Sequence, residues 1–442
     1  VKKILKYKFK AGLNHYKPVE IKNVYEDLNT PKNDALQYEL FENAITVLKN
    51  TEDILPIKNL ETNTIAYVKL GDDMNSSFVN TLKKYTEVTE VADEDIECLK
   101  EKLAVFNTVI VGFHKLDKAW KKDDFNEKEL AILQEIAKDH KVILDVFAKP
   151  YALNTITNFD NIEGVVVSYQ NSVISQVVSA QVIFGAVAAK GRVPVSINNN
   201  FKVNDGIDTQ KINRLGFATP ESVGMKSETL NKIDNLANYA INNEFTPGIQ
   251  ILVARKGKVV YQKSFGSQTY QKLQPINNSS IYDVASLTKI LATLPNVMQQ
   301  YDQQAINMET TLGTMLPMFN GTDKQNINFK DLLSHYAGLQ AWIPFYKATL
   351  DEKNHPSKKY YRKIADTEFS KQVADSLFIR NDYHDTIMKI IVDSKLSTVR
   401  EYKYSDFTFI ILKQYLETVT GKKLDDLIQT QFFNSMGMNN SN

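Results

Sequence analysis

The feature that most limits the possible folds is an alternation of short apolar runs with amphipathic stretches over residues 33–197. Four runs are rich in β-branched and aromatic residues: 65–68, 108–113, 142–147 and 164–168. Uninterrupted apolar character over so few residues is typical of strands that are buried on both faces. The amphipathic segments at 127–138 and 173–189 predict helices. Strands that alternate with helices predict a mainly parallel sheet in a three-layer α/β sandwich.

A second pattern begins after a polar segment at residues 201–219, which we interpret as a linker. An amphipathic helix is predicted at 226–240 from its apolar spacing. Two strands follow, joined by Lys256-Gly257 in a tight antiparallel hairpin: 248–255 and 258–265. From Leu287 onward the pattern is mostly helical. This order of elements predicts an α+β domain after the α/β sandwich.

The charge balance argues against two classes of partner. The 442 residues carry 53 basic and 52 acidic side chains, scattered along the chain, for a net charge of +1. A nucleic acid or an anionic membrane surface favours a strongly basic chain, so neither is expected as a partner. No apolar run approaches the ~20 residues that a membrane helix needs. The one cysteine, Cys98, excludes an intrachain disulfide, and no cofactor or metal is expected.

The strongest sign of chemistry is a Ser-x-x-Lys spacing, from Ser286 to Lys289. Residues three apart share a helix face, so the lysine amine can reach the serine hydroxyl and accept its proton. A helix N-terminus also supplies backbone N–H groups that favour negative charge on the attacking oxygen. To act as a base, Lys289 must be partly neutral at pH 7, which requires burial or a neighbouring cation. The alternative interpretation is an ordinary helix start with a surface lysine.

Four further segments in the right order support the catalytic interpretation. They are Thr-Pro-Glu-Ser-Val-Gly-Met at 219–225, the hairpin that begins at Pro247, Asp-Leu-Leu-Ser-His-Tyr-Ala-Gly-Leu at 331–339 and Tyr-Ser-Asp-Phe-Thr-Phe-Ile-Ile-Leu at 404–412. Together with the Ser-x-x-Lys they resemble the class C β-lactamase, DD-peptidase and esterase superfamily, the penicillin-binding type of serine hydrolase. The resemblance implies such a domain over residues 220–442, with Ser286 as nucleophile and Lys289 as its base.

Two more site residues come from this resemblance. In the superfamily the matching tyrosine passes on the nucleophile's proton and protonates the leaving group, a role that the resemblance gives to Tyr404. Asp406 stands where Asn is commoner. An ionised Asp could hold Lys289 by charge, but it would raise the pKa of Lys289 and oppose its role as base. This departure favours a peptidase or an esterase over efficient penicillin hydrolysis. His335 matches a packing position of the superfamily and is interpreted as structural.

A third superfamily motif, Lys-Thr-Gly or His-x-Gly on a core strand, does not occur in the sequence. In the superfamily that strand lines the site, helps to bind the substrate carboxylate and supplies half of the oxyanion hole. The last residues of the chain resemble a point well before it. We therefore expect the serine hydrolase domain to be truncated, and the 442 residues alone could be inactive.

The first domain carries a resemblance of its own. Residues 39–58, with Ala-Ile-Thr-Val-Leu-Lys-Asn and Ile-Leu-Pro-Ile, and residues 181–195, with Phe-Gly and Gly-Arg-Val-Pro-Val, resemble the ends of one known domain. That domain is the C-terminal α/β domain of family 3 glycoside hydrolases of the β-N-acetylhexosaminidase type. The resemblance implies that residues 34–200 form it and that residues 1–33 connect it to an upstream barrel absent from this chain. The glycosidase catalytic residues would lie on the barrel, so three carboxylates are considered but not assigned: Glu127, Glu129 and Asp145.

Two hypotheses of different kinds follow. The first is a hydrolase of the bacterial periplasm or cell envelope, its signal segment absent here, that joins a family 3 glycosidase region to a serine hydrolase. Its substrate would be a small molecule or a peptidoglycan fragment, and its catalytic residues would be Ser286, Lys289, Tyr404 and Asp406. The second is a non-catalytic module that binds a muropeptide or a partner, with Asp406 marking lost activity. An esterase for small acyl groups is a third possibility, and the oligomeric state stays open.

Overall fold

A computed structural model describes residues 1–72, 75–116 and 123–441. These residues fall into two compact units. The α/β unit comprises residues 1–281 and 435–441, and the site unit comprises residues 282–434. The division lies inside the segment 220–442 for which the sequence predicts one domain. The predicted domain boundaries stay a prediction.

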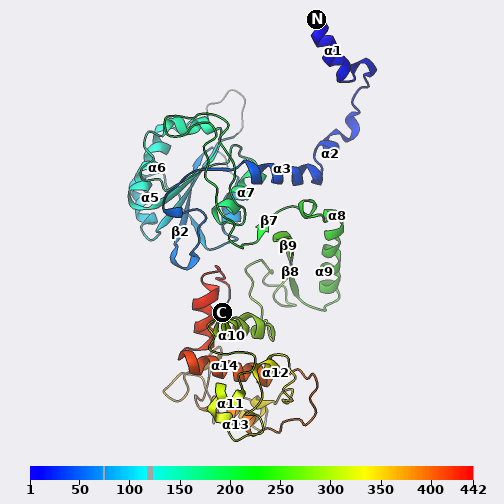
Figure 1. The fold of residues 1–442 in the computed structure, drawn as a ribbon, viewed down its shortest axis with the longest axis vertical. Coiled ribbons are helices and arrows are strands. Elements are labelled where there is room, and N and C mark those ends of the chain that lie inside the picture. The colour runs from blue at the N-terminus through cyan, green and yellow to red at the C-terminus, as the bar shows by residue number, and fades with distance from the viewer. Residues whose placement is uncertain (73–74, 117–122, 442) are drawn as a thin grey trace. The chain divides into compact units, whose positions relative to one another are not determined.

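The α/β unit is organised around one six-stranded sheet (Figure 1). Its strands are β1 (Thr46–Asn50), β2 (Ile65–Gly71), β3 (Val88–Glu90), β4 (Thr108–His114), β5 (Lys141–Phe147) and β6 (Gly164–Val167). Their spatial order is β1-β6-β5-β4-β2-β3, and every pairing is parallel except that of β1 with β6. The central pair, β4 with β5, runs in register from Thr108 opposite Lys141 to His114 opposite Phe147.

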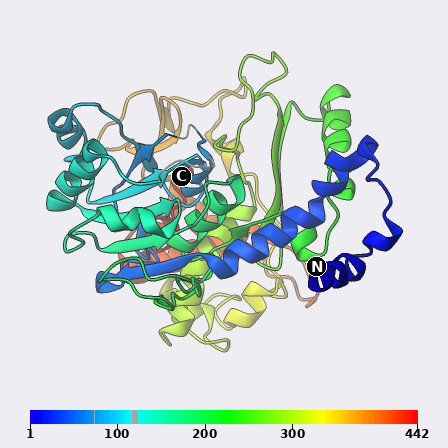
Figure 2. The same ribbon diagram turned by 90° about the horizontal axis from the view of Figure 1, so that it is seen from above.

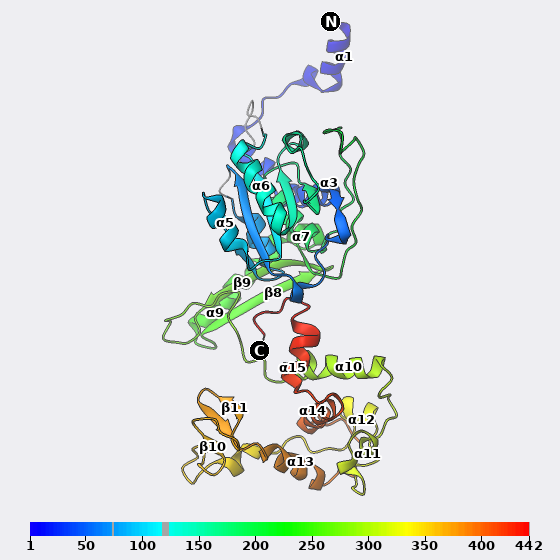
Figure 3. The same cartoon turned by 90° about the vertical axis from the view of Figure 1, so that its left-hand side faces the viewer.

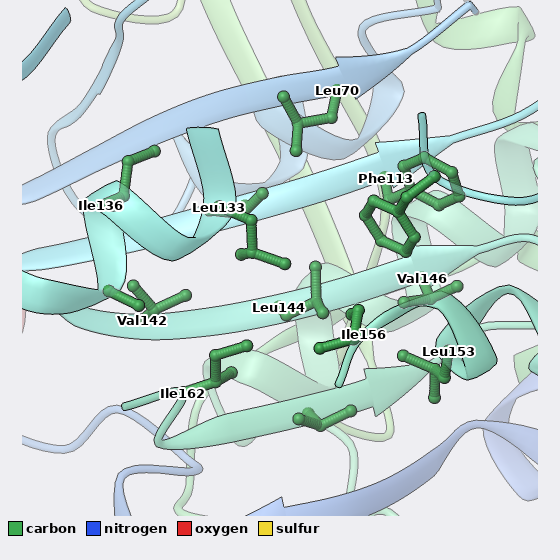
Figure 4. Close-up of a cluster of buried hydrophobic side chains, with 14 of the residues drawn as sticks. Leu70, Phe113, Leu133, Ile136, Val142, Leu144, Val146, Leu153, Ile156 and Ile162 are labelled. Atoms are coloured by element: carbon green, nitrogen blue, oxygen red, sulfur yellow. The ribbon is translucent and has the colours of Figure 1, made fainter. Parts of the chain in front are cut away.

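Helices cover both faces of this sheet because successive strand residues point in opposite directions. On one face Val109, Val111 and Phe113 pack with α5 (Ile96–Leu103) and α6 (Glu127–Asp139), and Figure 4 shows part of this core. On the other face Ile110, Ile143 and Val166 pack with α4 (Ser77–Leu82) and α7 (Val173–Ile183). The predicted three-layer, mainly parallel α/β sandwich is confirmed.

Local signals explain where the helices begin and end. Helix α6 starts at a capping box, in which Asn126 and Glu129 each accept a hydrogen bond from the other's backbone N–H. Helix α7 ends at Ile183, earlier than the predicted 189, because Gly185 has a φ of 69° that a right-handed helix cannot continue. Helix α3 (Pro31–Ala44) begins at the Thr30 cap and packs against α7 (Figure 2).

Among the residues that the structure describes, the rest of the α/β unit holds four α-helices and a three-stranded sheet of the order β7-β9-β8. They are α1 (Lys2–Lys10), α2 (Val24–Leu28), α8 (Ser227–Leu230), α9 (Lys232–Asn242), β7 (Gly216–Phe217), β8 (Gly248–Arg255) and β9 (Lys258–Gly266). The predicted hairpin is present: β8 and β9 are antiparallel, and Lys256 and Gly257 between them have φ values of 52° and 74°. Two positive values are the mark of a type I′ turn, which suits the twist of the strands.

The site unit is mostly helical, as predicted. Its helices are α10 (Leu294–Asp302), α11 (Leu312–Met315), α12 (Phe329–Leu333), α13 (Tyr383–Asp393), α14 (Asp406–Thr420) and α15 (Leu424–Ile428). Helix α14 is central to the core (Figure 3), where its Phe407, Ile411 and Leu412 are fully buried. The sequence did not predict a small sheet in this unit: β10 (Tyr361–Arg362), β12 (Leu377–Ile379) and β11 (Lys371–Ala374), in that order.

Candidate active site

Ser286 follows a backbone turn that the local sequence builds. The Asp283 side chain accepts a hydrogen bond from the Ala285 N–H at 2.8 Å. Ala285 has a φ of 44°, a left-handed conformation that is uncommon for a residue with a side chain. Backbone outliers of this kind cluster at functional sites. The turn leaves Ser286 exposed, one residue before the first helical residue.

Lys289 opens a π-helical turn, Lys289–Thr293, that continues into α10. Its Nζ donates a hydrogen bond to the Ser286 Oγ at 3.0 Å and lies 2.8 Å from the Asp406 Oδ1. A further hydrogen bond joins it to Tyr404. The two side chains of the Ser-x-x-Lys are thus as close as their spacing predicts.

The protonation of Lys289 follows from these contacts. Burial acts to lower the pKa of Lys289, but the hydrogen bonds with Asp406 and Tyr404 and the Asp406 charge outweigh it. The pKa of Lys289 is therefore raised above its ordinary value. Lys289 is an ammonium at neutral pH, which is the direction expected from an Asp at position 406.

Tyr404 and Asp406 are placed by the start of α14. Ser405 caps this helix, since its hydroxyl accepts the Phe407 N–H at 3.2 Å and donates to the Gln340 carbonyl at 2.5 Å. The Asp406 N–H donates to the Ala341 carbonyl at 2.8 Å. The cap therefore fixes the segment that carries both candidate residues against the chain that follows α12.

The Tyr404 side chain completes the cluster. Its ring centroid lies 5.3 Å from the Lys289 Nζ. A hydrogen bond with Ser286, and next one with Lys289, lowers the pKa of Tyr404 below its ordinary value, although partial burial acts against this. The surroundings thus favour the ionised form of both groups beside Ser286, the Lys289 ammonium and the Tyr404 phenolate.

These side chains lie in a cavity of about 400 Å³. It is lined by Ser286, Lys289, Ile290, Leu294, Leu333, His335, Tyr404 and Phe409. Ser286 and Lys289 come from the Ser-x-x-Lys, Tyr404 precedes α14, and His335 follows α12. The aliphatic and aromatic groups come from the π-helical turn, α10, α12 and α14. An apolar wall beside a serine and a lysine suits an acyl group that carries a carbonyl carbon to the hydroxyl.

Comparison with known proteins gives this part of the chain a family. The model of the family described as Beta-lactamase matches residues 235–442. Residues 235–442 are a β-lactamase-family domain. This family consists of serine hydrolases, and the candidate active site lies within the matched residues.

Curated relatives of the β-lactamase-family domain carry a more specific description. A protein of Escherichia coli O157:H7 named "Putative D-alanyl-D-alanine carboxypeptidase" is 22% identical over 249 residues, which are 53% of this chain and 52% of that protein. A Salmonella gallinarum protein of the same name is 25% identical over 239 residues, 51% of this chain and 49% of its own length. The chain therefore spans about half the length of the curated relatives it matches.

Solved structures show only distant likeness. A class C β-lactamase in complex with cefoxitin has a TM-score of 0.36 and 18% identity, over 48% of this chain and 51% of that one. A fungal multi-domain GH3 beta-N-acetylglucosaminidase has a TM-score of 0.35 and 21% identity, over 43% of this chain and 21% of that one.

His335 also lines the cavity of the β-lactamase-family domain, which the sequence did not predict. Its ring centroid is 4.8 Å from that of Tyr404, and its Nδ1 accepts the Ser405 N–H at 3.2 Å. This contact joins residues 70 positions apart, so no local spacing in the sequence could have indicated it.

The three unassigned carboxylates lie in the α/β unit, outside the β-lactamase-family domain. Glu127 is exposed in the first turn of α6. Glu129 belongs to the capping box of that helix and forms an ion pair with Lys115 at 3.2 Å. Asp145 is fully buried in β5, where it accepts a hydrogen bond from the Ser168 hydroxyl at 2.7 Å. Each has a structural contact or exposure that accounts for it.

Three further observations concern the described residues. Within residues 1–72, 75–116 and 123–441, no group of His, Cys, Asp and Glu side chains could hold a metal ion. Across the same residues, none of the helices combines the length and apolar character needed to cross a bilayer. Cys98 is exposed and unpaired with another cysteine.

Proposed function

We propose that the β-lactamase-family domain is an acyl-transferring serine hydrolase in which Ser286 is the nucleophile. The observation that carries this proposal is the contact of Lys289 Nζ with the Ser286 Oγ at 3.0 Å, together with the hydrogen bond of Tyr404 to the same serine. A hydroxyl becomes a useful nucleophile only where a neighbouring group takes its proton. Both neighbours that the sequence predicts for this task are in contact with it.

The two neighbours divide the work in a way that revises the sequence-based roles. Lys289 has a raised pKa and is held as an ammonium by Asp406, so it cannot accept the Ser286 proton in the resting site. Tyr404 has a lowered pKa because it is hydrogen-bonded to Ser286 and Lys289. We therefore assign proton acceptance to the ionised form of Tyr404 and charge stabilisation to Lys289.

The proposed reaction has two halves. The Ser286 Oγ attacks the substrate carbonyl carbon while its proton passes to the Tyr404 phenolate. The new C–O bond gives a tetrahedral oxyanion, which the helix N-terminus at Ser286 favours. Collapse breaks the bond to the leaving group, and Tyr404 returns the proton to it. Water then attacks the acyl carbon while its proton passes to Tyr404, and collapse breaks the bond to the Ser286 Oγ, which takes the proton back from Tyr404.

For the substrate we propose a peptidoglycan fragment and for the location the bacterial periplasm or cell envelope. The D-alanyl-D-alanine carboxypeptidase name of the curated relatives supports this. The resemblance of residues 34–200 to the α/β domain of family 3 β-N-acetylhexosaminidases also supports this substrate, because such enzymes act on aminosugar polymers. On this proposal the α/β unit carries no glycosidase catalytic residue and is a scaffold.

One observation favours a second candidate function, a non-catalytic module that binds muropeptides. Asp406 is paired with Lys289 at 2.8 Å and helps to hold it protonated. A site arranged to bind an acyl chain and a carboxylate, rather than to react, needs only that permanent positive charge beside an apolar wall.

Intact mass spectrometry of the 442-residue chain separates the two candidates. The chain is incubated with a fluorophosphonate and, separately, with a penicillin, alongside Ser286→Ala. The hydrolase predicts one adduct on the wild type and none on the variant. Ser334→Ala is the matched control, because Ser334 is also an exposed serine of the site unit and its hydroxyl bonds only a nearby carbonyl, that of Lys330.

The outcomes are distinct. An adduct that Ser286→Ala loses and Ser334→Ala keeps supports acyl transfer at Ser286. A folded wild type that forms no adduct with either reagent, but whose melting temperature rises with a muropeptide, supports the binding module instead. An adduct that survives in Ser286→Ala contradicts the assignment of the nucleophile.

A further inference from the structure

His335 contacts the chain on both sides of Tyr404. Its backbone carbonyl accepts the Lys403 N–H at 2.9 Å, and its ring Nδ1 accepts the Ser405 N–H at 3.2 Å. The two hydrogen bonds hold the residues immediately before and after the tyrosine. A single residue thus fixes the short segment from which the Tyr404 side chain reaches Ser286.

The backbone of His335 is arranged for this double contact. Its φ is 60°, in the left-handed region that side chains disfavour, and its own N–H donates to the Leu332 carbonyl at 3.2 Å. This conformation lets one residue end the α12 turn and still present both its carbonyl and its ring to residues 403–405. A costly conformation persists where the surroundings over-determine it, often at a functional site.

The ring contact works in one protonation state only. A neutral imidazole can accept at Nδ1 when its proton is on Nε2, whereas an imidazolium carries a proton on both nitrogens and accepts at neither. Burial, and next the Lys289 charge, lower the pKa of His335 below its ordinary value of 6.5, and Asp406 opposes this. His335 is therefore neutral at pH 7 and holds the segment.

The groups that face the ring come from each neighbouring element. Lys289 lies on the π-helical turn and Asp406 begins α14. Tyr402 and Tyr404 flank the bonded segment, with ring centroids 6.1 and 4.8 Å from that of His335. Among these neighbours Tyr404, whose pKa is lowered mainly by its hydrogen bond with Ser286, is the group that also gains a proton as the pH falls, because the proposed mechanism uses its ionised form.

We propose that His335 is a positioning residue that holds Tyr404 against Ser286, and that protonation of its ring releases Tyr404 and switches the site off in acid. This inference rests on the proposed function and adds a regulation to it. His335 does not touch the reacting atoms on this account; it acts through the backbone of Ser405.

Two substitutions separate the ring contact from the unusual backbone. Asn and Gly both tolerate a positive φ, so both can keep the left-handed conformation at position 335. Asn also places an acceptor oxygen the same number of bonds from the backbone as Nδ1, and that oxygen does not titrate. His335→Asn therefore keeps the contact without its pH dependence, while His335→Gly removes the contact.

The rate of fluorophosphonate adduct formation is measured from pH 5 to pH 9 for all three chains. The wild-type rate is expected to fall as the pH drops below the ordinary histidine range. His335→Asn is expected to lose the added fall of the wild type in acid and to keep only the fall that protonation of the Tyr404 phenolate gives to both chains, and His335→Gly to be slower by roughly tenfold to a hundredfold at every pH, since misplacing a catalytic group costs about that much. A pH profile of His335→Asn that is parallel to that of the wild type overturns the switch. A wild-type rate in His335→Gly overturns the positioning role.

A second measurement does not depend on activity. The chain has six histidines. Nitrogen-15 NMR of histidine-labelled protein, with His335→Asn to assign the signal, reports which ring nitrogen of His335 is protonated. The inference predicts the neutral Nε2–H form with a pKa below 6.5, even in a chain that forms no adduct. A proton on Nδ1 at pH 7.5 overturns the inference, whereas an absent adduct with the expected ring form overturns only the proposed function.

Discussion

Each compact unit holds a carboxylate beside hydroxyl groups, and the two carboxylates are treated in opposite ways. In the α/β unit Asp145 is fully buried with the hydroxyls of Ser168 and Ser179 and has no ion-pair partner among the residues that the structure describes, and burial raises its pKa to about 7. In the site unit the Asp406 side chain is 43% exposed and is paired with Lys289.

The difference separates a packing site from the candidate active site. Hydroxyls alone cannot replace the hydration that a buried carboxylate loses, so Asp145 tends to be neutral at the centre of a sheet. A lysine at 2.8 Å and access to solvent keep the charges of the other pair in place. The buried hydrogen bonds of Asp145 add rigidity to the sheet. The pair of Asp406 and Lys289 keeps an electric field beside the exposed Ser286.

The largest expected effect comes from removing the charge of Lys289, the partner of Asp406. Lys289→Met removes the ammonium that contacts Ser286, Asp406 and Tyr404, and we expect the rate of fluorophosphonate adduct formation to fall by about 10³-fold. Lys330→Met, an exposed lysine on α12, should leave the rate unchanged. A fall of less than threefold in Lys289→Met would mean that the ammonium does not support the chemistry.

A core substitution in each unit tests whether the two regions are stabilised separately. Leu144→Ala in β5 and Leu412→Ala in α14 both empty a fully buried position, and each should cost about 2–5 kcal/mol in the free energy of unfolding. Each is expected to lower its own unit's transition in a urea titration followed by hydrogen exchange. A single transition that both variants shift equally would show one cooperative structure.

The buried carboxylate should make the α/β unit sensitive to pH. The pKa of Asp145 is about 7 in the fold and 3.8 in the unfolded chain, so the stabilisation from its neutral form is complete below pH 4 and is lost as the pH rises towards 7. Asp145→Asn has no such loss, and its stability relative to the wild type should rise by on the order of 2–4 kcal/mol between pH 5 and pH 8. Urea midpoints at several pH values test this; parallel curves for the two chains would contradict it.

The smallest expected effect is on the rate of adduct formation and comes from changing Asp406, the carboxylate of the site unit. Asp406→Asn removes the charge that helps to raise the pKa of Lys289 and installs the commoner residue of the superfamily. A more neutral Lys289 could share in accepting the Ser286 proton, so the adduct rate at pH 8 should rise by up to about tenfold. A tenfold fall would show instead that Asp406 is needed to orient Lys289.

Strands β2, β4, β5 and β6 were predictable because their apolar runs are short, β-branched and bounded by polar residues, whereas the three-residue β3 has no such run. Strand β1 (Thr46–Asn50) was not predictable either, since it follows α3 after only Ile45 and the run reads as one segment. Strand β11 (Lys371–Ala374) is exposed throughout, so no alternation of polar and apolar residues marks it.

For the candidate site, the sequence predicted what local spacing can show and missed what depends on long-range contacts. Ser286 and Lys289 are three residues apart, and one helical turn brings them together. Tyr404 and Asp406 came from a resemblance, and their catalytic roles stay a prediction. The ring of His335 meets Ser405 only because the chain after α12 returns to the start of α14. The protonation state of Lys289 could be assigned only once the exposure of its neighbours and their distances from it were known.

The π-helical turn at Lys289–Thr293 has a consequence for changes in chain length. A π turn contains one more residue than an α turn, and removing one residue rotates the following helix by roughly 100° relative to the preceding one. Ile290 and Leu294 now both face the cavity, and Val297 is buried in the core. Deletion of one residue between 290 and 293 would rotate one side of the turn relative to the other. Either Lys289 would then point away from Ser286, or Val297 would point away from the core. Single-residue insertions and deletions here should therefore be tolerated less well than most side-chain exchanges.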